Sequence, residues 1–214
     1  WESLNKQLHF LLSLRHLNLS NTSLDELPTF SSPLGPTLSL LSLHLTGNQL
    51  QSIEALSGLL ALHYLFLDDN PLGSSTFDPL APLNKLQQMV SVSLNNTQLS
   101  GQLSLNGLPS RTGFVSLKDN ADLSDILMPS HHSHEILYYI DLEGTHNLSC
   151  QSLDEVSRWF NQQGELPSCV GSTHLGPECL SPQYINLGVV ASDHCRPNAP
   201  AALLVEEQNN DLDY

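Results

Sequence analysis

The sequence predicts an α/β solenoid, with short parallel strands on its concave face and mostly irregular or 3₁₀ segments on its convex side. Three observations lead to this prediction. An eleven-residue hydrophobic pattern recurs through residues 14–149, the same place in each copy holds Asn or Thr, and prolines gather between the copies. Self-similarity at a nearly fixed period is the signature of stacked repeats, each of which buries its apolar face against the next.

The recurring pattern is L-x-x-L-x-L-x-x-N-x-L. Four segments fit it well and two more keep part of it; in chain order the six are residues 14–24, 40–50, 62–72, 89–99, 112–122 and 137–147. The ninth position of the pattern is filled by Thr22, Asn48, Asn70, Thr97, Asn120 and Thr145. These residues are spaced 22 to 27 apart, which predicts about six repeats over residues 14–149.

The leucine spacing predicts the local structure of each repeat. In the L-x-L part the two leucines point to one side and the residue between them points to the other, as on a strand. The chain then turns, and a buried turn leaves backbone N–H and C=O groups that need partners. An inward-facing Asn offers both a donor and an acceptor, whereas Thr offers a single hydroxyl. Because half of these positions hold Thr, we expect a somewhat irregular ladder.

The pattern resembles that of the leucine-rich repeat family over roughly residues 14–148. The resemblance implies a curved stack of repeats with short parallel strands. Prolines in the connecting segments argue against long convex helices. Residues 77–88, FDPLAPLNKLQQ, are expected to hold a short helix, and the other connectors to form 3₁₀ turns or extended chain. The connector LSGQLSLNGLP is similar to the L-x-G-x-I/L-P segment of plant-type repeats.

Both ends of the stack need covering, because an open solenoid exposes its core there. Residues 1–13 carry leucines at helical spacing, which predicts either a capping helix or the remnant of an upstream repeat. At the other end, SLDEVSRWFNQQG predicts a helix that begins with a capping box of Ser152 and Glu155 and stops near Gly164. Its apolar face would consist of Val156, Trp159 and Phe160.

All four cysteines lie in residues 150–200, directly after the last repeat; they are Cys150, Cys169, Cys179 and Cys195. An even number at this place favours two disulfides over reduced thiols, and the gaps are longer than those of zinc sites. The stretch CLSPQYINLGVVASDHC resembles the second half of the cysteine-rich cap of extracellular leucine-rich repeat ectodomains, although the usual C-x-C opening is replaced by Cys150 alone. The resemblance implies the pairs Cys150–Cys179 and Cys169–Cys195.

Charge and glycosylation motifs bear on partners and compartment. The formal net charge of −15 disfavours nucleic acid and anionic membranes, and it favours a protein partner with a basic surface, although it also serves solubility. No run of 18 apolar residues is present, so no membrane insertion is expected. Residues 201–214 form an acidic tail. N-glycosylation sequons occur at Asn18, Asn21, Asn95 and Asn147; their number is close to chance, but they agree with the extracellular location that disulfides imply.

Candidate binding residues are those that flank the leucines, since they are expected on the concave face. The third repeat is unusual, because aromatic residues occupy positions that should meet water. The selected residues are His44, Tyr64, Phe66, Asp68, Phe114, Tyr139, Asp141 and Glu143. The alternative is that the aromatic rings only shield neighbouring strands by cross-strand packing.

No catalytic motif appears, and the histidine cluster SHHSHE at residues 130–135 lies in a connector, so no enzyme activity, metal or cofactor is expected. The sequence therefore predicts a non-catalytic extracellular protein-recognition module, such as a receptor ectodomain, an adhesion protein or a secreted binding protein. The alternative is a structural component of a larger extracellular assembly that contacts its neighbours through edges and tail.

Overall fold

The computed structural model describes residues 13–27, 30, 39–74, 78–129, 137–162 and 184–186. Of residues 161, 162 and 184–186 it describes the backbone alone. The expected N-terminal cap, the acidic tail and the SHHSHE cluster thus lie outside the described residues, apart from Ser13.

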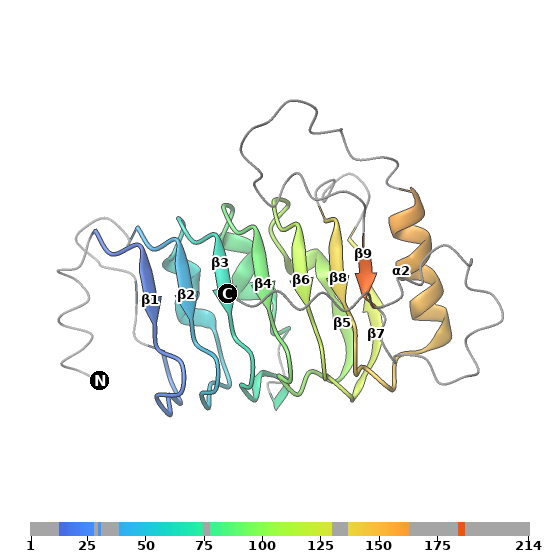
Figure 1. The fold of residues 1–214 in the computed structure, drawn as a ribbon, viewed down its shortest axis with the longest axis horizontal. Helices are drawn as coiled ribbons and strands as arrows, with labels where there is room; N and C mark the ends of the chain where they lie inside the picture. The colour runs from blue at the N-terminus through green and yellow to red at the C-terminus, as the bar shows by residue number, and fades with distance from the viewer. Residues whose placement is uncertain are drawn as a thin grey trace, which may run out of the picture.

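Seven parallel strands form one sheet along the length of the molecule, with each strand beside the strand of the next repeat (Figure 1). They are β1 (His16–Asn18), β2 (Ser42–His44), β3 (Tyr64–Phe66), β4 (Ser91–Ser93), β6 (Phe114–Ser116), β8 (Tyr139–Asp141) and β9 (Tyr184–Asn186). Each of the first six strands is centred on the first apolar residue of the predicted L-x-L, so the strands begin one residue before that motif. The parallel solenoid expected from the sequence is confirmed. β9 was not predicted and extends the sheet into the cysteine-rich segment.

The opposite side of the stack consists of 3₁₀ helices and a second, smaller sheet. The 3₁₀ helices are η1 (Glu54–Gly58), η2 (Leu72–Ser74), η3 (Ala81–Lys85) and η4 (Leu105–Gly107). The short helix expected in residues 77–88 is η3. The second sheet pairs β5 (Gly101–Ser104) with β7 (Leu123–Leu127) in parallel, and the sequence did not predict it.

The core lies between these two sides and consists almost entirely of aliphatic side chains. In the seven-stranded sheet, the central residues of β2, β3, β4, β6 and β8 are fully buried; they are Leu43, Leu65, Val92, Val115 and Ile140. Each such side chain contributes roughly 1.5–3 kcal/mol relative to an exposed position. Burial of the central residue places its two neighbours on the other face of the sheet, as strand alternation requires.

The predicted Asn/Thr ladder is present behind the sheet. Asn48, Asn70, Thr97, Asn120 and Thr145 are buried in neighbouring repeats. Asn70 Nδ2 donates to the carbonyls of Leu45, in the preceding repeat, and Leu67, in its own, at 2.9 and 2.8 Å. Thr145 Oγ1 donates only to Leu142 O of its own repeat, at 2.6 Å. The Asn70 amide therefore donates to two successive repeats, whereas the Thr145 hydroxyl closes a turn within one, which is the irregularity expected from the sequence.

Thr22 departs from the prediction that every ladder residue faces inward. It is exposed, because no described repeat packs in front of it. It nevertheless joins the ladder, since its amide nitrogen donates to Asn48 Oδ1 at 3.1 Å and its hydroxyl donates to Leu19 O at 2.7 Å.

A helix covers the end of the second sheet. α2 (Cys150–Gln162) packs against β7, and its buried face contains Val156, Trp159 and Phe160 as predicted. Trp159 Nε1 donates to Pro129 O at 2.7 Å. No helix among the described residues is long and apolar enough to cross a membrane.

The predicted capping box of α2 is wrong. The helix begins before Ser152, and the Oγ of Ser149 accepts the backbone N–H of Ser152 at 3.1 Å. The Ser152 hydroxyl instead accepts the backbone N–H of Ile126 in β7 at 2.8 Å. Glu155 accepts from Gln151 Nε2 on the helix surface. The expected stop at Gly164 lies outside the described residues.

Candidate functional site

The face of the seven-stranded sheet that points away from the leucine core, here called the open face, presents two columns of side chains. Strand register aligns them across β1, β2, β3, β4, β6 and β8. The first column contains His16, Ser42, Tyr64, Ser91, Phe114 and Tyr139. The second contains Asn18, His44, Phe66, Ser93, Ser116 and Asp141. The sequence-selected residues within strands thus share one face.

Four of the selected rings pack in pairs across neighbouring strands. His44 and Phe66 stack with centroids 4.3 Å apart and planes 12° apart. Phe114 and Tyr139 stack at 4.2 Å and 6°. This parallel packing agrees with the alternative interpretation of these two pairs, in which the rings shield neighbouring strands by packing across them.

Tyr64 differs from the other rings on the open face. Its neighbours in the first column are Ser42 and Ser91, so no ring on an adjacent strand stacks on it there. It lies 6.3 Å from the ring of His63 at an angle of 34°, and 37% of its surface is exposed. Tyr64 is the only large open-face hydrophobic residue among the exposed ones that the structure describes.

Beyond the strand ends, polar side chains link one repeat to the next. Asp68 Oδ1 accepts hydrogen bonds from Ser93 Oγ at 2.6 Å and from the backbone N–H of Asn95 at 2.8 Å. Asn95 Oδ1 repeats this arrangement with Ser116 Oγ at 2.6 Å and the N–H of Lys118 at 2.9 Å. The sequence did not reveal these bridges, because they depend on register between residues more than twenty positions apart.

The last two selected acids belong to the same polar edge. Asp141 is buried; its Oδ2 accepts from Tyr139 Oη at 3.0 Å, and its Oδ1 accepts from the N–H of Glu143 at 3.2 Å. Glu143 forms an ion pair with Lys118. The hydrogen bond that Lys118 donates to the Glu143 carboxylate raises the pKa of Lys118 and outweighs the partial desolvation that lowers it. The positive charge of Lys118 is therefore already neutralised by the Glu143 carboxylate.

The four sequons occupy different environments. Asn18, Asn21 and Asn147 are exposed. Asn95 is half-buried, and its Nδ2, the atom that a glycan would occupy, donates to Ser93 Oγ at 3.1 Å. A glycan at Asn95 would stand beside the polar bridges of the open face, whereas one at Asn147 would lie next to the start of α2.

Cys150, the first residue of α2, is disulfide-bonded. Cys169, Cys179 and Cys195 lie outside the described residues, so the pairing that the resemblance implies stays a prediction. Within the described ranges, no group of three or more His, Cys, Asp or Glu side chains is placed to hold a metal ion.

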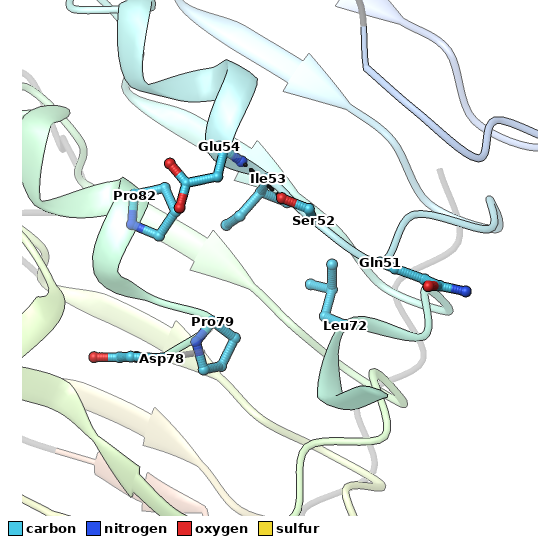
Figure 2. Close-up of a pocket in the computed structure, with 8 residues that line it drawn as sticks. All are labelled: Gln51, Ser52, Ile53, Glu54, Leu72, Asp78, Pro79 and Pro82. Atoms are coloured by element: carbon cyan, nitrogen blue, oxygen red, sulfur yellow. Dashed lines mark hydrogen bonds between the residues drawn. The ribbon is translucent and has the colours of Figure 1, made fainter. Parts of the chain in front are cut away.

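A cleft of about 370 Å³ lies on the other side of the molecule, between η1 and η3 (Figure 2). Figure 2 shows Glu54 and Pro82 on one side of it and Gln51 and Leu72 on the other. Its lining combines two prolines, two acids, two aliphatic side chains, Gln51 and Ser52. None of the sequence-selected residues lines it.

No family model matches the chain. The chain is similar to podocan from Mus musculus, a leucine-rich repeat protein, with 35% identity over 118 residues. The chain folds as a leucine-rich repeat solenoid. The similar region covers 54% of this chain but 18% of podocan, so the chain spans less than a fifth of that relative.

Proposed function

We propose that this chain is a non-catalytic, extracellular recognition module that binds a protein partner through the open face of its sheet, the face expected to be concave. The observation that carries the proposal is Tyr64, an exposed aromatic residue two positions before Phe66, which stacks on His44. Rigid aromatic side chains that are held in place and exposed are the usual anchors of protein interfaces.

The extracellular part of the proposal rests on separate support. Cys150 is disulfide-bonded, and structural disulfides persist mainly in oxidising compartments. Three exposed sequon asparagines are compatible with glycosylation there. A receptor ectodomain, an adhesion protein and a secreted binding protein all satisfy these conditions, and the net charge favours a partner with a basic surface.

The test is a binding screen of the purified chain against a panel of purified secreted and cell-surface proteins by biolayer interferometry. A binder found this way is measured again with Tyr64→Ala and with Phe66→Ala. Because anchor truncation typically removes at least 1–2 kcal/mol, we expect about a tenfold or greater loss of affinity with little change in melting temperature. Leu60→Ala is the matched control, since Leu60 is 51% exposed and lies outside the sheet.

A loss of melting temperature without loss of binding would favour the alternative, in which the rings only stabilise the stack. Binding that falls with Leu60→Ala but not with Tyr64→Ala would place the contact elsewhere and contradict the proposal.

A further inference from the structure

The first column of the open face contains an interrupted row of rings. Tyr64, Ser91 and Phe114 are aligned on β3, β4 and β6, which lie side by side (Figure 1). Adjacent strands lie about 4.8 Å apart, so the backbones that carry Tyr64 and Phe114 are about 9.6 Å apart. Where rings do occupy adjacent strands, they stack at 4.2–4.3 Å. The space above Ser91 thus has the width of one planar group between two rings.

The second column leaves the same space open. Ser93 follows Ser91 on β4 and stands next to Phe66. The Ser93 hydroxyl donates to Asp68, and it thereby draws that carboxylate toward β4. Asp68 Oδ2 accepts no hydrogen bond from any residue that the structure describes, whereas Oδ1 accepts two. Asp68 Oδ2 therefore lies at the border of the space above Ser91 and Ser93. It is held in place and can still accept a hydrogen bond.

The charge around this space is negative. The nearest described cation of the open face, Lys118, is paired with Glu143. The chain as a whole carries 22 acidic against 7 basic residues. A group that is planar, positively charged and able to donate to a carboxylate from its edge fits both the width and the charge. Arginine has all three properties, because its guanidinium is flat, stacks on aromatic faces and bonds to carboxylates.

We propose that the slot over β4, formed by Tyr64, Ser91, Ser93, Phe114 and Asp68, receives an arginine side chain of a protein partner. Its guanidinium stacks between Tyr64 and Phe114 and donates to Asp68. This assignment rests on the proposed function, and it narrows the partner to one that presents an exposed arginine. A lysine lacks the flat surface, phenylalanine has no donor for the carboxylate, and tyrosine can donate to it but carries no positive charge.

The first test uses short peptides and the folded chain. Acetyl-Gly-Arg-Gly-amide is titrated into the ¹⁵N-labelled chain, and the amide shifts of Ser91, Val92 and Ser93 are followed by NMR. The matching lysine and tyrosine peptides are the comparison. We expect saturable shifts with the arginine peptide and at least about fivefold weaker binding of the lysine peptide. Equal binding of arginine and lysine, stronger binding of tyrosine, or no shift with any peptide overturns the assignment.

Two variants locate the effect. Ser91→Phe places a ring in the slot, which the fold tolerates at the aligned Phe114, and it should abolish the shifts without lowering the melting temperature. Asp68→Asn keeps the acceptor for Ser93 but removes the charge, and we expect about a fivefold or greater loss. Asp69→Asn is the charge-matched control, because Asp69 lies on the adjacent exposed turn and accepts from Asn96. If Asp68→Asn and Asp69→Asn weaken binding of the arginine peptide equally, the peptide is held only by long-range attraction to negative charge. That result would overturn the assignment.

The failure of this inference can be told apart from failure of the proposed function. If a protein partner loses affinity with Tyr64→Ala but keeps it with Ser91→Phe, the open face binds and the arginine slot is refuted. If neither variant affects a partner that Leu60→Ala weakens, the proposed function itself is refuted.

Discussion

Asn120 accepts both the backbone N–H and the hydroxyl of Thr97, one repeat earlier, with its Oδ1 atom at 3.0 Å from each donor. The same oxygen accepts the N–H of Leu99 at 3.0 Å. Its Nδ2 donates to Leu94 O of the preceding repeat and to Leu117 O of its own repeat, at 2.9 and 2.8 Å. One buried amide therefore satisfies the turns of two successive repeats, and a Thr at the preceding position depends on the Asn that follows it.

We predict that Asn120→Ala destabilises the chain far more than Thr97→Val. The Asn120 change orphans backbone groups in two repeats and should lower the free energy of unfolding by about 2–4 kcal/mol, at about 1–3 kcal/mol per buried group with partial relaxation. Thr97→Val removes one hydroxyl, whose single proton can go to Leu94 O or to Asn120 Oδ1, and about 1 kcal/mol is expected. Urea denaturation followed by circular dichroism measures both. Equal losses would contradict the view that the Asn120 amide contributes more to the joining of repeats than the Thr97 hydroxyl.

A second prediction concerns Gly73, where η2 approaches the turn of the next repeat. A Cβ at Gly73 would lie 1.7 Å from the backbone oxygen of Gln98, and the chain cannot move away because Gly73 N donates to Thr97 O at 3.0 Å. We expect Gly73→Ala to cost about 3 kcal/mol or more. Gly101→Ala is the control for backbone strain alone, since Gly101 has a φ of +67° but open space around it, and about 1–2 kcal/mol is expected there. Thermal melting compares the two, and a larger loss at Gly101 would show that packing between repeats is loose.

The seven-stranded sheet could be predicted from the sequence, apart from β9, because the leucine pattern that marks each strand is local and recurs in every repeat. Each L-x-L points its two apolar side chains into the core and predicts a strand, and the Asn or Thr five residues after the central residue of that strand marks the turn. The sheet of β5 and β7 was missed because it lies in connectors without a shared period, where Gly101 begins one strand and Leu123 the other. β9 was missed because its pairing with β8 spans more than forty residues.

The candidate site could be placed on a face but not resolved into its interactions. Alternation puts Tyr64, Phe66 and Phe114 outward, and this much follows from the pattern. Which rings stack and which stays exposed depends on register and side-chain geometry across strands, so Tyr64 could not be distinguished from Phe66. The same limit explains the misplaced cap of α2: Ser152 and Glu155 match a local motif, but the Ser152 hydroxyl bonds Ile126, which is distant in sequence.

A third prediction tests the corrected start of α2. Ser149→Ala removes the oxygen that accepts the N–H of Ser152, and it should lower the free energy of unfolding by about 1 kcal/mol, as for other N-cap residues. Glu155→Ala removes a surface contact with Gln151 and should change it by less than about 0.5 kcal/mol. Chemical denaturation followed by tryptophan fluorescence reports on both, since Trp159 is buried in this helix. A larger effect at Glu155 would restore the capping box predicted from the sequence.

A fourth prediction follows from the raised pKa of Lys118. The hydrogen bond that Lys118 donates to Glu143 raises this pKa above the ordinary value of 10.5, so the folded state holds the proton more tightly than the unfolded chain. The stabilisation is thus fully present below about pH 10.5 and is lost as the pH rises through the folded pKa. Because the two side chains are 35% and 43% exposed, solvent screening limits it to about 0.5 kcal/mol.

The measurement is the difference in unfolding free energy between the native chain and Lys118→Gln, at several pH values from 7 to 11.5. We expect a small constant difference up to about pH 10, which then shrinks toward zero, and a smaller difference in 1 M salt. Lys85→Gln is the control, since Lys85 forms no ion pair with the described residues. A Lys118 difference that grows with rising pH would contradict the sign, because it would require the folded state to bind its proton more weakly.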